Sequence, residues 1–360
     1  MDYSWHQLER DSALVRRLRW FWLLGLVVVG VAAVAFYEIF FGPNRFSDAD
    51  EKTFYVSKGQ TFASVVDSLE AAGIIRSRPW FVFVARLHGG TTRVQIGKYK
   101  FATGVSNYHL LLALTEGQDI ALTSTTLPEG LTSYQQAHIL AHAVGIDSVL
   151  FVHLVHDEAF VRSLGISSHS LEGYLFPETY SFAWQPDERD VITRLVREFQ
   201  SIYTDSLQAR ARELGWTTNQ VLTLASIVEG EAGLAEERPI ISGVYHNRLR
   251  KGMRLQADPT IRFTIGGGPR RILYSDLQVG NPYNTYRNTG LPPGPINNAG
   301  KASILAALFP TRHEYLFFVA NGKGGHWFSS TYAEHQRYVR KYRREIRMRA
   351  EKSLTKADGR

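Results

Sequence analysis

The 360-residue sequence contains no cysteine. Disulfide bonds, thiolate metal ligands and cysteine nucleophiles are therefore excluded. The chain also lacks an HExxH motif, and His326 and His335 are too far apart for the i, i+4 zinc pattern. It lacks the Gly-x-Ser-x-Gly turn that carries the nucleophile of many serine hydrolases. The glycine run at 266–269 has no P-loop lysine and threonine and predicts a turn. We therefore expect neither a metal ion nor a cofactor.

Net positive charge is absent outside one segment. The formal net charge is +7, and residues 337–360 alone hold ten Lys and Arg against three Asp and Glu. That difference equals the whole net charge, so the rest of the chain is neutral overall. Such a tail either contacts an acidic polymer or anionic lipid, or is the solvated end of a helix. Nothing resembling a nucleic-acid-binding module accompanies it, and we predict no nucleic-acid partner.

The sequence has a single long apolar run, at residues 20–41, which excludes a multi-span transporter. Its only charge is Glu38, and it is long enough to cross a bilayer. Arginines precede the run and acidic residues follow it, which places residues 1–19 in the cytoplasm and the bulk of the protein outside. A cleaved signal peptide is the alternative, because Ala33–Ala35 fits a cleavage site. The run is longer than a usual signal core, so we favour a retained anchor in the inner (cytoplasmic) membrane.

Two domains are predicted beyond this anchor. Residues 42–51 are a polar linker. Residues 52–118 have the order β-α-α-β-α, with strands at 52–57 and 94–101 and helices near 61–73, 78–88 and 106–116. Residues 122–340 form a larger mixed domain, with helices near 132–143, 147–164, 188–214, 239–250 and 301–308 and a strand at 315–320. The fold class is therefore α+β, with a basic tail at 341–360.

The segment Thr223–Gly233 predicts an apolar helix that ends at two glutamates. By their spacing, Leu222, Ala225, Ser226 and Glu229 share one helical face. A carboxyl at the end of an apolar stripe loses hydration, which favours its protonated form and suits a general acid. Glu231 lies roughly 200° around the helix from Glu229, so the two cannot both face one cleft. Taken alone, the segment favours a helix-end glutamate in solvent.

Several motifs occur together with this helix: Glu172–Tyr180, Leu224–Glu229, Leu255–Thr260, Tyr283–Tyr286, Gly290–Ile296, Tyr315–Ala320, Gly325-His326 and Thr331–His335. With the N-terminal anchor, they resemble the endolytic murein transglycosylase family, the YceG-like membrane-anchored lytic transglycosylases, over roughly residues 52–340. The sequence departs from the family at Gly230–Ala232, where a Lys-Glu-Thr run is common. It departs again at Glu178, where aspartate is common.

The resemblance implies cleavage within the glycan strands of peptidoglycan, between N-acetylmuramic acid and N-acetylglucosamine, to leave 1,6-anhydro-N-acetylmuramyl ends. Its catalytic glutamate corresponds to Glu229. The family also implies partnership with peptidoglycan polymerases. Val56–Phe62 is similar to the opening of a LysM module, which binds glycans, although Gln60 replaces the usual acidic residue. Residues 52–118 are thus LysM-like, as either a sugar-binding domain or a structural spacer.

One carboxyl is sufficient for such a reaction, because the sugar's own 6-hydroxyl attacks the anomeric carbon. Hydrolytic glycosidases usually need two. Glu229 would protonate the leaving oxygen and then, as carboxylate, accept the proton of that hydroxyl. The rivals are a noncatalytic glycan-binding scaffold and a muramidase with Glu178 or Asp258 as second carboxylate.

Further residues are candidates for substrate contact. Gln256, Asn284 and Tyr286 are suited to hold N-acetyl groups or to orient the reacting hydroxyl. Aromatic side chains in the loop at 171–181 are suited to stack on sugar rings; they are Tyr174, Phe176 and Tyr180. Core packing or loop hydrogen bonding is the alternative for each, and Asp258 before Pro259 is also compatible with a simple turn.

Overall fold

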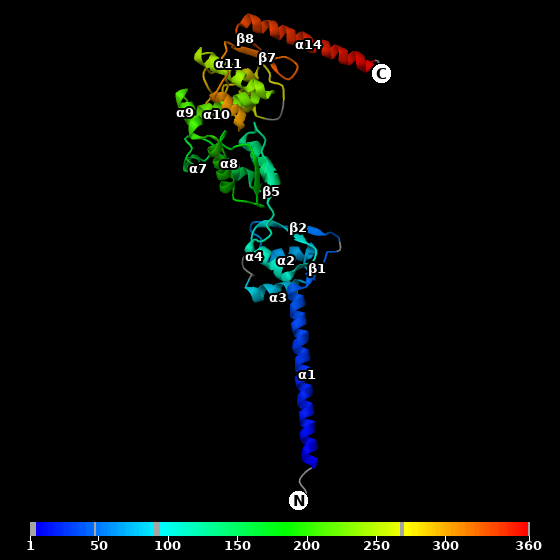
Figure 1. The fold of residues 1–360 in the computed structure, drawn as a ribbon. Coiled ribbons are helices and arrows are strands. Elements are labelled where there is room, and N and C mark those ends of the chain that lie inside the picture. Colours follow the sequence, from blue (N-terminus) through cyan, green and yellow to red (C-terminus); the bar gives the residue numbers. More distant parts are fainter. Residues whose placement is uncertain (1–4, 47, 90–93, 267–269, 359–360) are drawn as a thin grey trace. The chain divides into compact units, whose positions relative to one another are not determined.

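The computed structural model describes residues 5–46, 48–89, 94–266 and 270–358. The chain forms two compact units (Figure 1), the first up to residue 123 together with 183–185, the second comprising 124–182 and 186 onwards. Each unit has its own hydrophobic core. Mixed helix and strand content agrees with the predicted α+β class. The turn predicted at the glycine run falls largely on residues 267–269, outside the described residues.

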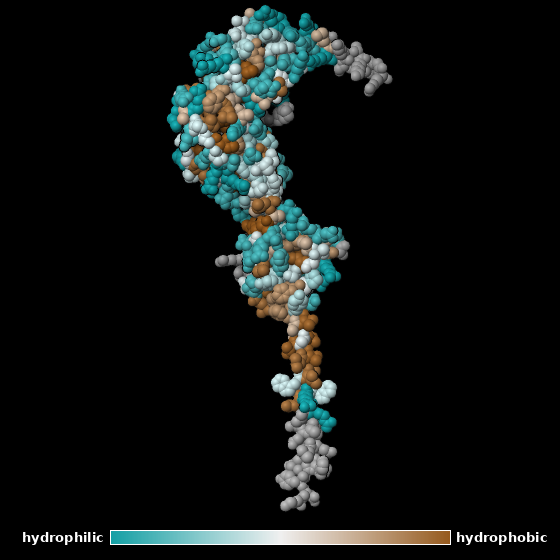
Figure 2. Space-filling model, viewed as in Figure 1, coloured by the Kyte–Doolittle hydropathy of each residue, from teal (hydrophilic) through white to brown (hydrophobic). Residues whose placement is uncertain are grey.

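A long helix, α1 (Trp5–Phe41), begins the chain. Its segment Arg16–Phe41, of 26 residues, is long and apolar enough to cross a membrane by length and composition. At 1.5 Å per residue it measures about 39 Å, against about 30 Å for the hydrocarbon core of a bilayer. Large apolar side chains such as Phe21, Leu26 and Val29 are exposed along it, and Figure 2 shows a brown stretch on this helix.

The rest of the first unit has the predicted β-α-α-β-α order: β2 (Glu51–Val56), α2 (Phe62–Ala71), α3 (Arg78–His88), β3 (Gly97–Ala102) and α4 (Asn107–Glu116). Strand β2 pairs antiparallel with β3, from Glu51 opposite Ala102 to Val56 opposite Gly97. The short strands β1 (Pro43–Asn44) and β4 (Val105–Ser106) also pair antiparallel. Thr61 caps α2 by accepting a hydrogen bond from the Ser64 N–H, as its position before the helix predicts.

The second unit is mainly helical. Its helices are α5 (Ser133–Val144), α6 (Ser148–Val155), α7 (Glu158–Ser163), α8 (Glu188–Ile202), α9 (Asp205–Glu213), α10 (Thr218–Glu231), α11 (Arg238–Arg250), α12 (Asp258–Ile265), α13 (Lys301–Leu308) and α14 (Tyr332–Asp358). Short 3₁₀ turns are η1 (Ala235–Glu237) and η2 (Asp276–Gln278). Strand β5 (Thr123–Thr126) pairs with β6 (Thr179–Phe182), and β7 (Phe317–Ala320) with β8 (His326–Ser329).

Three predicted elements of this unit were wrong. The helix expected at 147–164 is two helices, because the Asp157 carboxylate accepts the Ala159 and Phe160 N–H groups and starts α7. The helix expected at 188–214 also breaks in two, at Tyr203 and Thr204, and Thr204 is the N-cap of α9. The turn expected at Asp258 is the start of α12, since proline fits the first turn of a helix.

Helix α10 is the central element of the second unit. Thr217 and Gln220 form a capping box at its start, and every residue from Val221 to Val228 is buried. Helix α13 packs along it, and the loop before α13 is tied to it through Ser226. The Ser226 hydroxyl accepts the Ile296 N–H at 3.0 Å, and the Asn297 amide donates to the Ser226 carbonyl at 2.9 Å. The C-terminal end of α10 and the segment before α13 are therefore held together.

Candidate active site

Glu229 lies in the last turn of α10, on the face that the sequence predicted to be apolar. Its Oε2 accepts the Gly300 N–H at 3.1 Å, and its Oε1 lies 3.1 Å from Nη2 of Arg238 on α11. The side chain is only 7% exposed. A helix C-terminus disfavours a negative charge, whereas Gly300 is the N-cap of α13, where a negative charge is favoured. The carboxyl is thus held in one position by a cation and a helix N-terminus.

A second carboxyl, Glu129, shares this site. It follows β5, about a hundred residues earlier in the chain, and its Oε2 lies 3.7 Å from the same Arg238 Nη2. Its side chain is 48% exposed. Burial and then the negative charge of Glu229 raise the pKa of Glu129, and Arg238 opposes both effects. Glu129 is not among the residues that the sequence predicted for the site. Arg238 was not predicted either, because only the folded chain brings the start of α11 to the end of α10.

A buried polar network holds the Glu129 segment against the Gly300 segment. The Asn298 side chain accepts the N–H groups of Gly173 and Leu175 and donates to Leu131 O and to Glu172. The Asn298 carbonyl accepts the Gly130 N–H at 2.9 Å, and the Asn298 N–H donates to the Leu131 carbonyl at 2.8 Å. Because every one of these polar groups is paired, the network fixes both segments.

Glu172 is the ionisable member of this network. It accepts the Ser133 N–H, and the Ser133 hydroxyl at 2.6 Å. Burial raises the pKa of Glu172 to about 7, although the two bonds from Ser133 oppose the shift. Its side chain is buried among the residues that position the site, so the shift reflects enclosure and not access to a substrate.

Glu231 belongs to a different set of contacts. Its Oε1 accepts the Tyr245 hydroxyl at 2.9 Å. Burial raises the pKa of Glu231 to about 7, with the Tyr245 hydrogen bond opposing and Asp258 adding to the shift. Asp258 in turn accepts the Tyr286 hydroxyl at 2.6 Å. The two glutamates of α10 therefore have separate polar partners, in line with their helical phase.

Among the residues proposed for substrate contact, four have surface available to a ligand. Glu178, Gln256 and Asp258 are exposed, and Tyr286 is partly so. Gln256 is unusual because its φ of 51° lies in the left-handed region, which a non-glycine residue adopts at a cost of about 1 kcal/mol or more. Its N–H bonds Thr285 O at 3.1 Å. Such strain often accompanies a functional loop.

The other four proposed contacts are buried. Asn284 donates its amide to Leu277 O and Val279 O and accepts the Tyr286 N–H, so its polar atoms hold the loop. Tyr180 donates its hydroxyl to Phe176 O, and both side chains lie in the hydrophobic core. Tyr174 packs edge-on against Phe199. For these residues the geometry favours the structural alternative.

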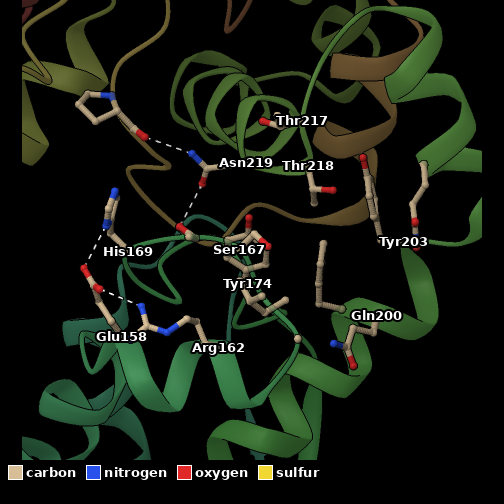
Figure 3. Close-up of a pocket in the computed structure, with 16 residues that line it drawn as sticks. Glu158, Arg162, Ser167, His169, Tyr174, Gln200, Tyr203, Thr217, Thr218 and Asn219 are labelled. Carbon is tan, nitrogen blue, oxygen red and sulfur yellow. Dashed lines mark hydrogen bonds and ion pairs between the residues drawn. The ribbon is translucent and has the colours of Figure 1, made fainter.

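A hollow of about 860 Å³ lies at the other end of α10 (Figure 3). Tyr174, Tyr203 and Asn219 line it, and the Asn219 side chain donates to Pro293 O at 3.1 Å. Asn219 is ten residues before Glu229, which is about 15 Å along the helix. We therefore place the candidate catalytic centre at the carboxyls and not in this hollow, because the hollow does not include either of them.

In the described ranges no group of three or more His, Asp or Glu is arranged to hold a metal ion. Two carboxyls and a guanidinium are suited to move protons and to stabilise developing positive charge. That is chemistry of the kind used at glycosidic bonds.

Comparison with known proteins identifies the family. The YceG-like family matches residues 54–341. An endolytic murein transglycosylase from Bacillus subtilis strain 168 is 32% identical over 314 residues, covering 82% of this chain and 86% of that protein. Its namesake from Streptococcus pneumoniae strain R6 is 28% identical; 81% of this chain is covered, and the match spans 59% of the pneumococcal protein. The crystal structure of a putative YceG-like protein from Listeria monocytogenes has a TM-score of 0.57 and 30% identity, over 80% of this chain and 98% of that one. The chain therefore belongs to the YceG-like family.

Proposed function

We propose that this protein is a peptidoglycan lytic transglycosylase that cleaves within nascent glycan strands. Its family, and relatives named endolytic murein transglycosylase, support the reaction class. The observation that carries the proposal is the fixed carboxyl of Glu229, bonded to Arg238 and to the Gly300 N–H beside the half-exposed Glu129.

In the proposed reaction Glu229 protonates the glycosidic oxygen while the bond to the anomeric carbon of N-acetylmuramic acid breaks. The 6-hydroxyl of that sugar then forms the new bond to the anomeric carbon and gives its proton to the Glu229 carboxylate. The products are an anhydro end and a free 4-hydroxyl, and the carboxyl is restored. No water is consumed.

Gln256, Asp258, Tyr286 and Glu178 are proposed as sugar contacts, since they are accessible. The LysM-like unit is proposed to add glycan affinity, supported only by its order of elements and its opening motif. Helix α1 is proposed as a single-pass anchor in the cytoplasmic membrane, with both units on the outer side. Peptidoglycan polymerases are proposed partners, on the strength of the family alone.

Hydrolysis and noncatalytic binding are the alternatives. A muramidase would need a second carboxylate to activate water. In the described part of the chain, neither Glu178 nor Asp258 forms a hydrogen bond or ion pair with Glu229, and Asp258 accepts a hydrogen bond from Tyr286. The second carboxyl of the site is Glu129, which lies against the same Arg238, so product analysis decides between hydrolysis and the lytic reaction. A scaffold would need no fixed acid.

Product analysis by mass spectrometry separates these functions. Wild-type protein incubated with glycan strands should give anhydro ends, whereas reducing ends would indicate a hydrolase and intact strands a scaffold. We expect Glu229→Gln to lower cleavage by at least about a hundredfold, the usual contribution of a general acid or base. Glu236→Gln is the matched control, because Glu236 is exposed on η1. Normal cleavage by a folded Glu229→Gln protein would refute the assignment.

A further inference from the structure

Glu129 and Glu229 share one guanidinium. Nη2 of Arg238 lies 3.1 Å from Glu229 Oε1 and 3.7 Å from Glu129 Oε2. The guanidinium is held in place, since its Nε donates to the Ser303 hydroxyl at 3.1 Å and its side chain is 16% exposed. Two carboxylates against one cation leave a net charge of minus one. A single proton on the pair makes the group neutral.

Gly300 accommodates both carboxyls. Its N–H bonds Glu229, while a Cβ at this position would overlap Oε1 of Glu129. The absence of a side chain at residue 300 therefore leaves the space that the Glu129 carboxyl occupies. This close approach shows that Glu129 is part of the local packing of the site and is not an isolated surface residue.

The polar groups around the pair come from two helices, α11 and α13. The two carboxyls face Arg238 from α11, and α13 contributes the Gly300 N–H and the Ser303 hydroxyl. Repulsion between neighbouring carboxylates favours retention of one proton by the pair as a whole. The raised pKa of Glu129, caused by burial and then by the charge of Glu229, agrees with this arrangement.

An arginine paired with Glu229 alone would stabilise the carboxylate, which cannot protonate a leaving oxygen. Building on the proposed function, we propose that Glu129 is a positioning residue for the catalytic proton: it shares the charge of Arg238 and so allows the carboxyl pair to hold one proton before cleavage. That proton goes to the leaving oxygen when the glycosidic bond breaks. The 6-hydroxyl returns a proton to the pair when the anhydro bond forms, so the protons balance.

The test is the pH dependence of cleavage by the full-length Glu129→Gln variant. Glutamine removes one negative charge, so Arg238 pairs with Glu229 alone and the proton is lost at lower pH. We expect the high-pH limb of the rate profile to move down by about one pH unit, which gives about a tenfold loss of rate on that limb. Glu129→Asp should restore part of the shift, and Glu236→Gln should keep the wild-type profile.

A Glu129→Gln variant with an equal loss at every pH would reveal a purely structural role and would overturn the proposal. An unchanged rate and profile would overturn it as well. A second readout needs no turnover: infrared titration of the Glu129 carboxyl, assigned with Glu129→Gln, in wild type and in Glu229→Gln. We expect the pKa of Glu129 to fall when Glu229 is neutral, and an unchanged pKa would contradict the shared proton. Failure of the proposed function would look different, as wild type that does not cleave at any pH.

Discussion

Glu229 and Glu231 are two residues apart on α10, yet their surroundings differ. Glu229 contacts the Arg238 guanidinium and the Gly300 N–H, and a second, half-exposed carboxyl lies against the same guanidinium. Glu231 meets the Tyr245 hydroxyl, and burial raises its pKa to about 7. Glu172, which is also buried, has a similarly raised pKa. A raised pKa therefore marks enclosure as readily as catalysis, and the arrangement of partners is the better guide to the active carboxyl.

The largest difference is expected between Arg238, which contacts Glu129 and Glu229, and Arg248, whose positive charge opposes the rise in the pKa of Glu231. Arg238→Ala leaves Glu129 and Glu229 facing each other without a cation, so the pair holds its proton more tightly and Glu229 loses one of the contacts that position it. We expect cleavage to fall more than about tenfold, with a smaller loss of unfolding free energy than for Arg248, because Glu129 is half exposed to solvent. Arg248→Ala removes a buried guanidinium that donates to Leu316 O and Leu255 O, so we expect a loss of about 3 kcal/mol in unfolding free energy. Cleavage assays and urea unfolding of both variants check this. A comparable loss of unfolding free energy in both variants would contradict the expected difference between the two arginines.

Glu231→Gln should change the pH dependence of stability more than it changes the rate of cleavage. In the folded protein the pKa of Glu231 is about 7, above its ordinary value of 4.5, so the folded state holds the proton more tightly than the unfolded chain. The contribution of this proton to the unfolding free energy is therefore fully present below about pH 4.5 and is lost as pH rises through about 7. The variant should lose less stability than wild type between pH 5 and 7, as measured by thermal unfolding. Part of the slope should remain, since Glu172 contributes with the same sign. A cleavage loss as large as that of Glu229→Gln would show that the Glu231 side also takes part in chemistry.

The smallest effect is expected for Tyr286→Phe. The change removes one hydrogen bond to Asp258 at the surface, which is worth about 1 kcal/mol. If Tyr286 contacts sugar, KM for glycan strands should rise with little change in kcat; steady-state kinetics separates the two constants. An unchanged KM would leave Tyr286 as a loop residue.

The candidate acid could be predicted from the sequence because its signal is local. The spacing of Ser226 and Glu229 gives the helical face, although the capping box of Thr217 and Gln220, where the helix begins, was not part of the prediction. Helix α13 was predicted at its observed bounds for the same reason. The division of the predicted helix 188–214 depends on the local backbone at Tyr203 and Thr204, which periodicity does not detect because apolar positions continue on both sides.

Glu129 and Asn298 could not be predicted, because their roles depend on contacts across the fold. Glu129 meets Glu229 only when the chain after β5 packs against the segment before α13. Asn298 and Asn284 are fully buried polar residues, and an isolated asparagine in a loop has no pattern that indicates which backbone groups it will satisfy. Glu129 lies between proline and glycine, and Asn298 lies between Asn297 and Ala299. Both are ordinary loop sequences that give no sign of a site.

The left-handed backbone of Gln256 bears on how this protein could be engineered. Glycine adopts that conformation freely, so replacement of Gln256 by glycine would relieve local strain of about 1 kcal/mol. A redesign that optimised thermal tolerance alone would therefore choose glycine and discard the exposed amide. Residue 256 is a position at which robustness and side-chain chemistry oppose each other, and a thermostable variant of this enzyme should keep its glutamine.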